Sequence, residues 1–167
     1  VLAEATERVD PKTAYTAGLV ADIGKLALAH ACGKFYPAVR EFRIATNCTW
    51  DQAERTVVGY HHADVGVRLL LSWRFPPLFI LAAQHILRPS EAPEEVMPLL
   101  SHIHAAKYVS TAMGPGVTEE GFLVMLPANF LQEWGFTQEM LEEAMPVVLE
   151  RAAKRLGDRL SHGAISV

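Results

Sequence analysis

Apolar residues recur at helical spacing along almost the whole chain, and this periodicity constrains the fold more than any other feature of the sequence. No stretch of useful length alternates apolar and polar residues as a half-buried strand does. The sequence therefore predicts an all-α fold, a single compact multi-helix bundle. The clearest apolar stripe lies in the last predicted helix, which Thr137 caps. Its members are Met140, Leu141, Ala144, Met145, Val148, Leu149, Ala152, Ala153 and Leu156.

Local signals place several helix ends. Pro11, a residue favoured in the first helical turn, begins a segment that stays apolar on most faces to residue 31. We predict one central helix here, covered by other helices. Thr49 with Gln52 three positions later predicts a capping box, and Gly59 can end the helix that follows. Further helices are predicted over 61–73, 76–87 and 94–113, whereas 117–127 and 130–136 fit either a helix or a strand.

Composition limits the class of protein. The chain has 167 residues, half of them hydrophobic and a fifth charged, which suits one globular domain over 1–167. A net charge of -4 without a basic stripe argues against nucleic acid and anionic lipid as partners. No apolar run reaches the ~20 residues that span a bilayer. The two cysteines, Cys32 and Cys48, form no disulfide framework, so we expect a reducing cytoplasm. The helical start without Met indicates a fragment of a longer chain.

Polar residues inside apolar helices are the candidates for chemistry. They are Asp22, His61, His62, His85, His102 and His104. Such nitrogen and oxygen donors suit zinc, iron, manganese or magnesium, and helical bundles build metal sites from inward side chains on facing helices. The spacing alone matches no local metal motif, however, since the chain has neither His-x-x-x-His nor a His-Asp pair. Serine-nucleophile, phosphate-loop and dinucleotide motifs are absent from the sequence too.

Each of these residues also has an interpretation without chemistry. His61 and His62 open a helix, where a histidine commonly bonds backbone or water, and His85 ends one, where a cation suits the helix dipole. His102 and His104 are two positions apart, so we expect at most one to face inward and neither to be a ligand. Asp22 is flanked by apolar residues and needs a partner. A helix N-terminus, a histidine or a metal would serve.

The order of the motifs resembles the HDOD family, the HD-related output domains of bacterial signalling proteins. The resemblance lies in AYTAGLVADIGKLALA at 14–29, AERTVVGYHHADVGVRLLLSWRFP at 53–76, LAAQHI at 81–86 and SHIHAAKYVSTAMG at 101–114. It extends from about Ala14 to Leu160. It implies an HD-domain-like bundle whose N-terminal helices lie upstream of Val1 or are missing.

The resemblance also implies which metal ligands are lost. In catalytic HD phosphohydrolases a histidine precedes the aspartate of this helix and both bind metal, whereas Ala21 precedes Asp22 here. His62 matches a histidine that binds metal in the related cyclic-di-GMP phosphodiesterases. His85 lies about one residue from the double-histidine position of those enzymes. A last family carboxylate would fall around Ala106 and is absent.

The implied function is therefore that of a pseudoenzyme. Asp22, His62 and His85 would be vestigial metal-site positions, with His61 and Asp64 in a polar cleft, no catalytic residue, no cofactor and at most weak metal binding. Asp22 and His62 would stabilise the fold by bonding each other or a helix end. The partner would be a signalling protein (a receiver, a cyclic-di-GMP enzyme or a kinase) or a cyclic nucleotide-like ligand.

Two alternatives stay open. The first is a metal-dependent HD-type phosphodiesterase with an unusual ligand set: Asp22, His61, His62 and His85, with His102 or His104. The second is a pure interaction domain without any small ligand.

Overall fold

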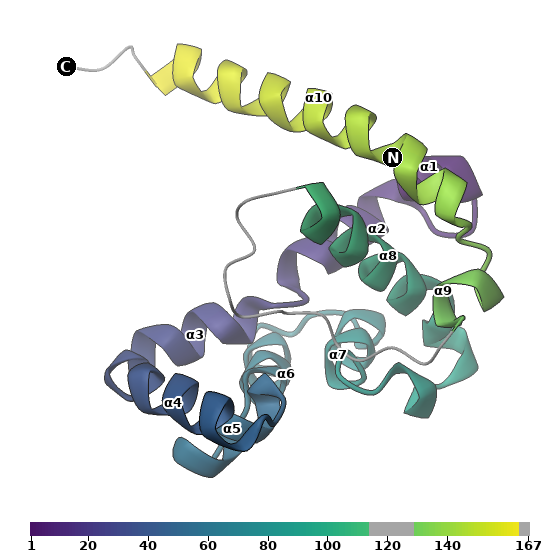
Figure 1. Cartoon of the computed structure of the whole chain (residues 1–167). Helices are drawn as coiled ribbons and strands as arrows, with labels where there is room; N and C mark the ends of the chain where they lie inside the picture. The colour runs from purple at the N-terminus through teal and green to yellow at the C-terminus, as the bar shows by residue number, and fades with distance from the viewer. Residues whose placement is uncertain (114–128, 164–167) are drawn as a thin grey trace.

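The computed structural model describes residues 1–113 and 129–163, with the side chains of the last helix described as far as Lys154. Every regular element within these residues is a helix, which confirms the predicted all-α fold (Figure 1). The predicted element at 117–127 lies outside the described residues. In chain order the elements are α1 (Leu2–Thr6), α2 (Pro11–Val20), α3 (Ile23–Cys32), η1 (Gly33–Phe35), α4 (Tyr36–Thr46), α5 (Trp50–Val57), α6 (His62–Ser72), α7 (Pro77–Gln84), η2 (Pro89–Glu91), η3 (Glu94–Val96), α8 (Met97–Met113), α9 (Phe130–Glu133) and α10 (Gln138–Gly163).

The capping signals read from the sequence are confirmed. The Gln52 side chain accepts a hydrogen bond from the Thr49 backbone N–H at 3.1 Å at the start of α5. Gly59, just beyond the end of α5, has a φ of 93°, a left-handed conformation that glycine adopts without a steric penalty. Thr137 Oγ1 accepts from the Met140 N–H at 3.2 Å at the start of α10.

The predicted single helix over 11–31 is wrong, because it is two helices joined by a turn at Ala21 and Asp22. Asp22 has φ -109° and ψ 17°, which is not helical. The turn directs α3 against α6, where Gly24 permits close backbone contact. A Cβ atom at residue 24 would lie only 1.9 Å from the carbonyl oxygen of His62. Helical periodicity does not reveal such a break, since both halves keep the same period.

The expectation that this segment is covered on most faces is also wrong. Ala17 and Val20 of α2 and Leu28 of α3 are buried, but Leu19 and Leu26 are 68% and 71% exposed. Small and medium side chains on one face meet the core, and the larger apolar residues of the other face remain on the surface.

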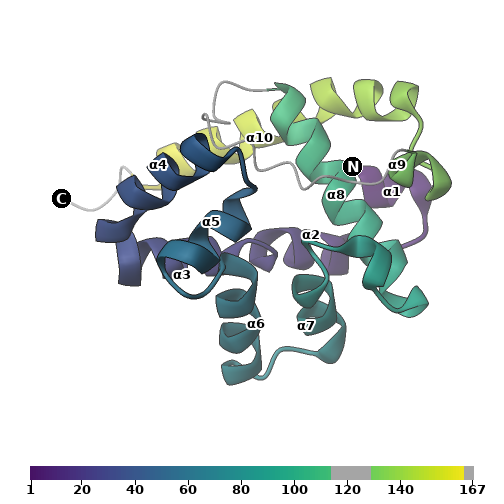
Figure 2. The same ribbon diagram turned by 60° about the horizontal axis from the view of Figure 1, so that its bottom comes forward.

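The helix that other elements surround is α8. It packs against α1, α2, α9 and α10, and Figure 2 shows it passing among them. As a result both His102 and His104 are buried, at 4% and 3% exposure. The expectation that at most one of them faces inward is wrong, because a helix packed on several sides has no single inner face.

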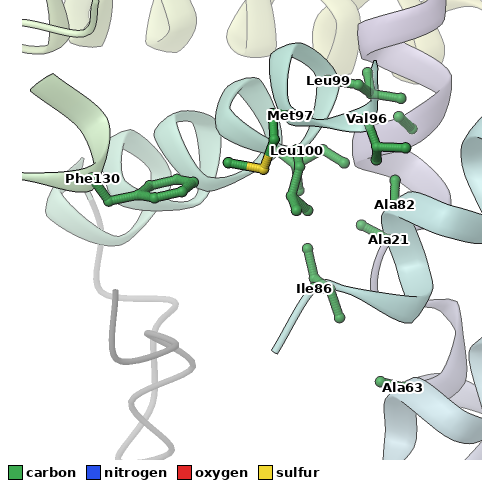
Figure 3. Close-up of a cluster of buried hydrophobic side chains, with 11 residues drawn as sticks. Ala21, Ala63, Ala82, Ile86, Val96, Met97, Leu99, Leu100 and Phe130 are labelled. Atoms are coloured by element: carbon green, nitrogen blue, oxygen red, sulfur yellow. The ribbon is translucent and has the colours of Figure 1, made fainter. Parts of the chain in front are cut away.

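A cluster of apolar side chains between α8, α7 and the end of α2 forms much of the core (Figure 3). Ile86 and Leu100 are fully buried in it, and such side chains each contribute roughly 1.5–3 kcal/mol on burial. Ala21 belongs to this cluster, so the residue before Asp22 faces apolar neighbours. The α2–α3 turn is thereby fixed against the centre of the bundle.

Within 1–113 and 129–163, no helix is both long enough and apolar enough to traverse a bilayer.

Candidate functional site

Asp22 is held by two lysines from different helices. Lys107 Nζ, on α8, lies 2.9 Å from Asp22 Oδ1, and Lys25 Nζ, one turn into α3, lies 3.1 Å from the same oxygen. The two lysine side chains are 19% and 17% exposed, and that of Asp22 is 37% exposed. The partner that the sequence required for Asp22 is therefore a pair of ammonium groups.

Electrostatics follow from this arrangement. Partial burial would by itself raise the pKa of the Asp22 carboxyl, but the charges of Lys107 and Lys25 and their hydrogen bonds outweigh it, so the pKa is lowered. For Lys25, burial and the like charge of Lys107 lower the pKa despite the attraction of Asp22. A carboxylate bonded in this way is ionised at neutral pH.

His104 lies on α8 one turn before Lys107, so the two side chains share a face of the helix. Its Nε2 atom is buried and has no hydrogen-bond partner, and its ring meets the edge of the Phe130 ring with centroids 5.8 Å apart. Burial and then the charge of Lys107 lower the pKa of His104 to about 4, although Asp22 acts in the opposite direction. An unpartnered buried polar atom costs about 1–3 kcal/mol, so Nε2 stands out in this part of the protein.

His62 is bound to Glu54, a residue that the sequence analysis did not single out. The Glu54 side chain is fully buried. Its Oε2 accepts the His62 backbone N–H at 2.8 Å and lies 2.6 Å from His62 Nδ1, and its Oε1 accepts from Trp50 Nε1 and Tyr36 Oη, both at 3.0 Å. Burial would raise the pKa of Glu54, but these hydrogen bonds and the charge of His62 lower it.

The expectation that Asp22 and His62 bond each other or a helix end is therefore wrong for both side chains. Asp22 is the N-cap residue of α3, yet its side chain bonds no backbone N–H of that helix. The carboxylate turns toward α8 and Lys107. His62, at the first position of α6, turns toward α5 and Glu54. Charged partners on neighbouring helices thus satisfy each side chain separately.

His61 and Asp64 form a small polar group at the start of α6. His61 is the N-cap residue, and its Nδ1 accepts the Asp64 backbone N–H at 3.2 Å, as the interpretation without chemistry predicted. The Asp64 carboxylate in turn pairs with Arg55 at 2.9 Å. Burial lowers the pKa of His61, so its ring is neutral at pH 7 and can accept this hydrogen bond.

His85 ends α7, as the sequence predicted, and is half-buried. Its backbone N–H bonds to Leu81 O at 3.1 Å.

The described residues do not fit the metal that the wider HD fold implies. Within them, no group of three or more His, Cys, Asp or Glu side chains converges so that it could hold a metal ion. Two lysine ammonium groups already contact Oδ1 of Asp22. A divalent cation that bound this oxygen would be repelled by both of them. The charge that a metal would neutralise is already neutralised by the protein.

Ala21 and Ala106, which stand where the resemblance implies metal ligands, lie in different surroundings. Ala21 is buried among apolar side chains of the core cluster. Ala106, the residue before Lys107 on α8, lines a cavity of about 640 Å³ between α1, α2, α8 and α10. Tyr15, Ile103 and Val148 also line that cavity, which is mainly apolar.

Sequence reasoning missed Lys25, Glu54 and Lys107. For Lys25 a signal was present, because residues three apart on a helix are neighbours and an Asp–Lys pair at this spacing is favourable. Glu54 lies eight residues before His62 in the same motif, but a loop separates them and no periodicity relates them. Lys107 is 85 residues from Asp22, so only the folded chain brings it close.

Comparison with known proteins gives one match. The family model described as HDOD domain matches residues 1–89, which are more than half of the chain and include Asp22, His61, His62 and His85. Lys107 lies beyond the matched residues, so the Asp22–Lys107 bridge joins the matched segment to the rest of the chain. No match was found among curated proteins or solved structures. The chain belongs to the HDOD family, the HD-related domains of signalling proteins.

Proposed function

We propose that this chain is a non-catalytic regulatory output domain of a bacterial signalling protein, one HDOD domain over 1–167 that acts in the cytoplasm. It would work by binding a partner protein or a nucleotide-like ligand, without a cofactor. The observation that carries the proposal is the Lys107–Asp22–Lys25 cluster, in which two ammonium groups occupy the one retained acidic position.

The chemistry of hydrolysis supports this proposal. A hydrolytic metal needs several fixed ligands and an open position for water. Here the carboxylate of Asp22 is bonded to lysines, and Nδ1 of His62 is bonded to Glu54. His85 lies at the end of another helix. Asp22, His62 and His85 thus lie in three separate environments and do not share one site.

Exposed apolar residues on α2 and α3 support a binding role. Tyr15 and Leu19, four positions apart on α2, are 56% and 68% exposed, and Leu26 on α3 is 71% exposed. Exposed large apolar side chains that share a helix face are typical of protein-binding surfaces. A receiver domain, a cyclic-di-GMP enzyme or a kinase of the same pathway is the class of partner that we propose.

One observation favours the second candidate function, a metal-dependent phosphodiesterase. Metal-binding histidines commonly donate their other ring N–H to a carboxylate, and Glu54 is placed to accept it from His62 Nδ1. His62 Nε2 would then be the donor atom for a metal, with Asp22, His61 and His85 completing the set. Lys107 and Lys25 would first have to leave Asp22.

The experiment combines metal analysis with turnover. The purified chain is equilibrated with manganese, iron(II) or zinc, passed through a desalting column and assayed for bound metal and for hydrolysis of cyclic-di-GMP and bis-p-nitrophenyl phosphate. The regulatory proposal expects substoichiometric metal and no turnover above buffer. Stoichiometric metal with hydrolysis that His62→Ala abolishes would overturn it and establish the phosphodiesterase.

A further inference from the structure

The cavity between α1, α2, α8 and α10 is a separate feature of the protein, since neither Asp22 nor His62 lines it. Its volume is about 640 Å³. Protein interiors hold few voids larger than a water molecule, whereas ligand pockets measure ~300–1,000 Å³. Each of the four helices leaves room here by presenting residues without a bulky side chain. These are Ala3, Ala14, Gly18, Ala106 and Ala152.

Helix α10 is fixed on both sides of the cavity. Its first two turns pack on α8, where Leu141 and Ala144 are buried. Further along, Arg151 Nη1 donates to both carboxylate oxygens of Glu4 on α1, at 2.9 and 2.8 Å. Val148 lies between these two anchor points and lines the cavity. Helix α10 therefore bridges the cavity without filling it.

The uncharged polar side chains of the cavity wall already have partners within the protein. His102 Nε2 lies 2.7 Å from Thr6 Oγ1, and its Nδ1 lies 2.6 Å from the Pro98 carbonyl oxygen. The Thr16 hydroxyl donates to the Lys12 carbonyl oxygen at 2.9 Å. A ligand in the cavity therefore meets a wall that is mainly apolar, and apolar contact would supply most of its binding.

Lys12 is the charged residue of the wall that stays without a close partner. The Glu4 carboxylate is paired with Arg151 and lies 3.3 Å from the Val1 amine. The Lys12 charge acts on the Asp10 carboxylate, but among the described residues the ammonium group forms no ion pair or hydrogen bond. A ligand with one negative charge complements this wall.

We propose that the cavity binds a small amphipathic anion, a single apolar chain that ends in a carboxylate. The chain would lie against Ile103, Ala106 and Val148, and the carboxylate would pair with Lys12. A helix with its side chains is about 10 Å across, so the cavity would hold only about one and a half turns of it. An extended chain is thinner and uses the same volume better. The inference goes beyond the proposed function and does not depend on it.

The test measures binding to the 167-residue chain by titration calorimetry. The probes are octanoate, hexanoate and octyltrimethylammonium, each below its micelle concentration. We expect saturable binding of octanoate. Hexanoate has two methylene groups fewer and should bind roughly 15-fold more weakly. The cation should also bind more weakly than octanoate, because Lys12 repels it.

Cavity-filling variants locate the site. Ala106→Trp fills the cavity from α8 and should abolish octanoate binding, and Ala106 is exposed, so the larger side chain displaces no core residue. The matched control is Ala38→Trp, at an exposed position of α4 that does not line the cavity, and it should bind octanoate as the wild type does. Circular dichroism checks both folds. Ala152→Trp, which fills the cavity from α10, carries the test if Ala106→Trp does not fold.

A charge variant tests the carboxylate contact. Lys12→Met should weaken octanoate binding about two- to fivefold, the range expected for an exposed ion pair, and should leave the binding of octan-1-ol unchanged. Lys12→Arg retains the charge and should retain the affinity for octanoate.

Several outcomes would overturn the inference. They are the absence of saturable octanoate binding, octanoate binding that the cavity-filling variants leave unchanged, and equal affinity for octanoate and octyltrimethylammonium. Self-association of the chain that Ala106→Trp abolishes, measured by analytical ultracentrifugation, would also overturn it, because a second copy would then occupy the cavity. None of these outcomes bears on the metal and hydrolysis measurements that test the proposed function.

Discussion

Glu54 and His62, eight residues apart, are joined twice: the Glu54 carboxylate accepts the His62 backbone N–H at 2.8 Å and contacts Nδ1 at 2.6 Å. The carboxylate also accepts from the side chains of Trp50 and Tyr36. This network connects α4, α5 and α6 around one fully buried acid. Through this network His62 links the start of α6 to the buried acid of α5.

Glu54→Ala should lower the free energy of unfolding by about 3–5 kcal/mol, because it leaves the buried donors of His62, Trp50 and Tyr36 without an acceptor. Urea denaturation followed by circular dichroism measures the change. Glu95→Gln, at an exposed site, is the control and should change stability by less than about 0.5 kcal/mol. Equal stability of the two variants would contradict the network described here.

Gly24→Ala should separate α3 from α6. The new Cβ would lie 1.9 Å from His62 O and 2.6 Å from Gly66 N, and both are backbone atoms that cannot move cheaply. We expect a loss of about 3 kcal/mol or more in thermal or urea unfolding. The matched control is Gly18→Ala, where the new Cβ meets nothing within 4 Å. The higher helix propensity of alanine should raise the free energy of unfolding of this variant by about 0.5–1 kcal/mol. A tolerated Gly24→Ala would mean that the two helices are not in such close contact.

Acidification should destabilise the protein through His104. Its pKa is about 4 in the folded chain against 6.5 for the free side chain, so between these values the unfolded chain binds a proton that the folded chain does not. The contribution of neutral His104 to the free energy of unfolding is therefore fully present above pH 6.5. It falls by roughly 3 kcal/mol as the pH approaches 4. Lys107 and Asp22 are the charged groups that act on the ring.

Urea unfolding of the wild type and of His104→Leu at pH 7, 6 and 5 measures this contribution. The variant should lose part of the pH dependence and keep the share from His61 and His102, whose pKa values burial also lowers. Identical pH profiles of the two proteins would show that His104 is not buried in its neutral form.

Two neighbouring leucines of α6 test the burial pattern. Leu70 is fully buried and Leu71 is 56% exposed. Leu70→Ala should cost about 2–5 kcal/mol of unfolding free energy, and Leu71→Ala should stay within about 0.5 kcal/mol. The same denaturation assay measures both. Comparable losses at the two positions would mean that α6 is rotated about its axis relative to this structure.

The sequence by itself determined the class of fold and several helix ends. Apolar period, capping residues and breakers act within a few positions of the chain, so the caps at Thr49 and Thr137 and the stop at Gly59 were predictable and are confirmed. The apolar residues around Asp22 also indicated that its carboxylate needs a partner. The same local signals indicated that His61 opens a helix and bonds backbone, as its hydrogen bond from the Asp64 N–H confirms.

Only the tertiary structure decided which side chain meets which. The bond between Asp22 and Lys107 joins residues 85 positions apart, and burial of both His102 and His104 follows from the packing of α8 on several sides. Periodicity could not reveal the turn at residues 21 and 22, because long-range contacts with α6 and α8 hold it. Partners distant in sequence are set by how helices pack, and no local pattern records that packing.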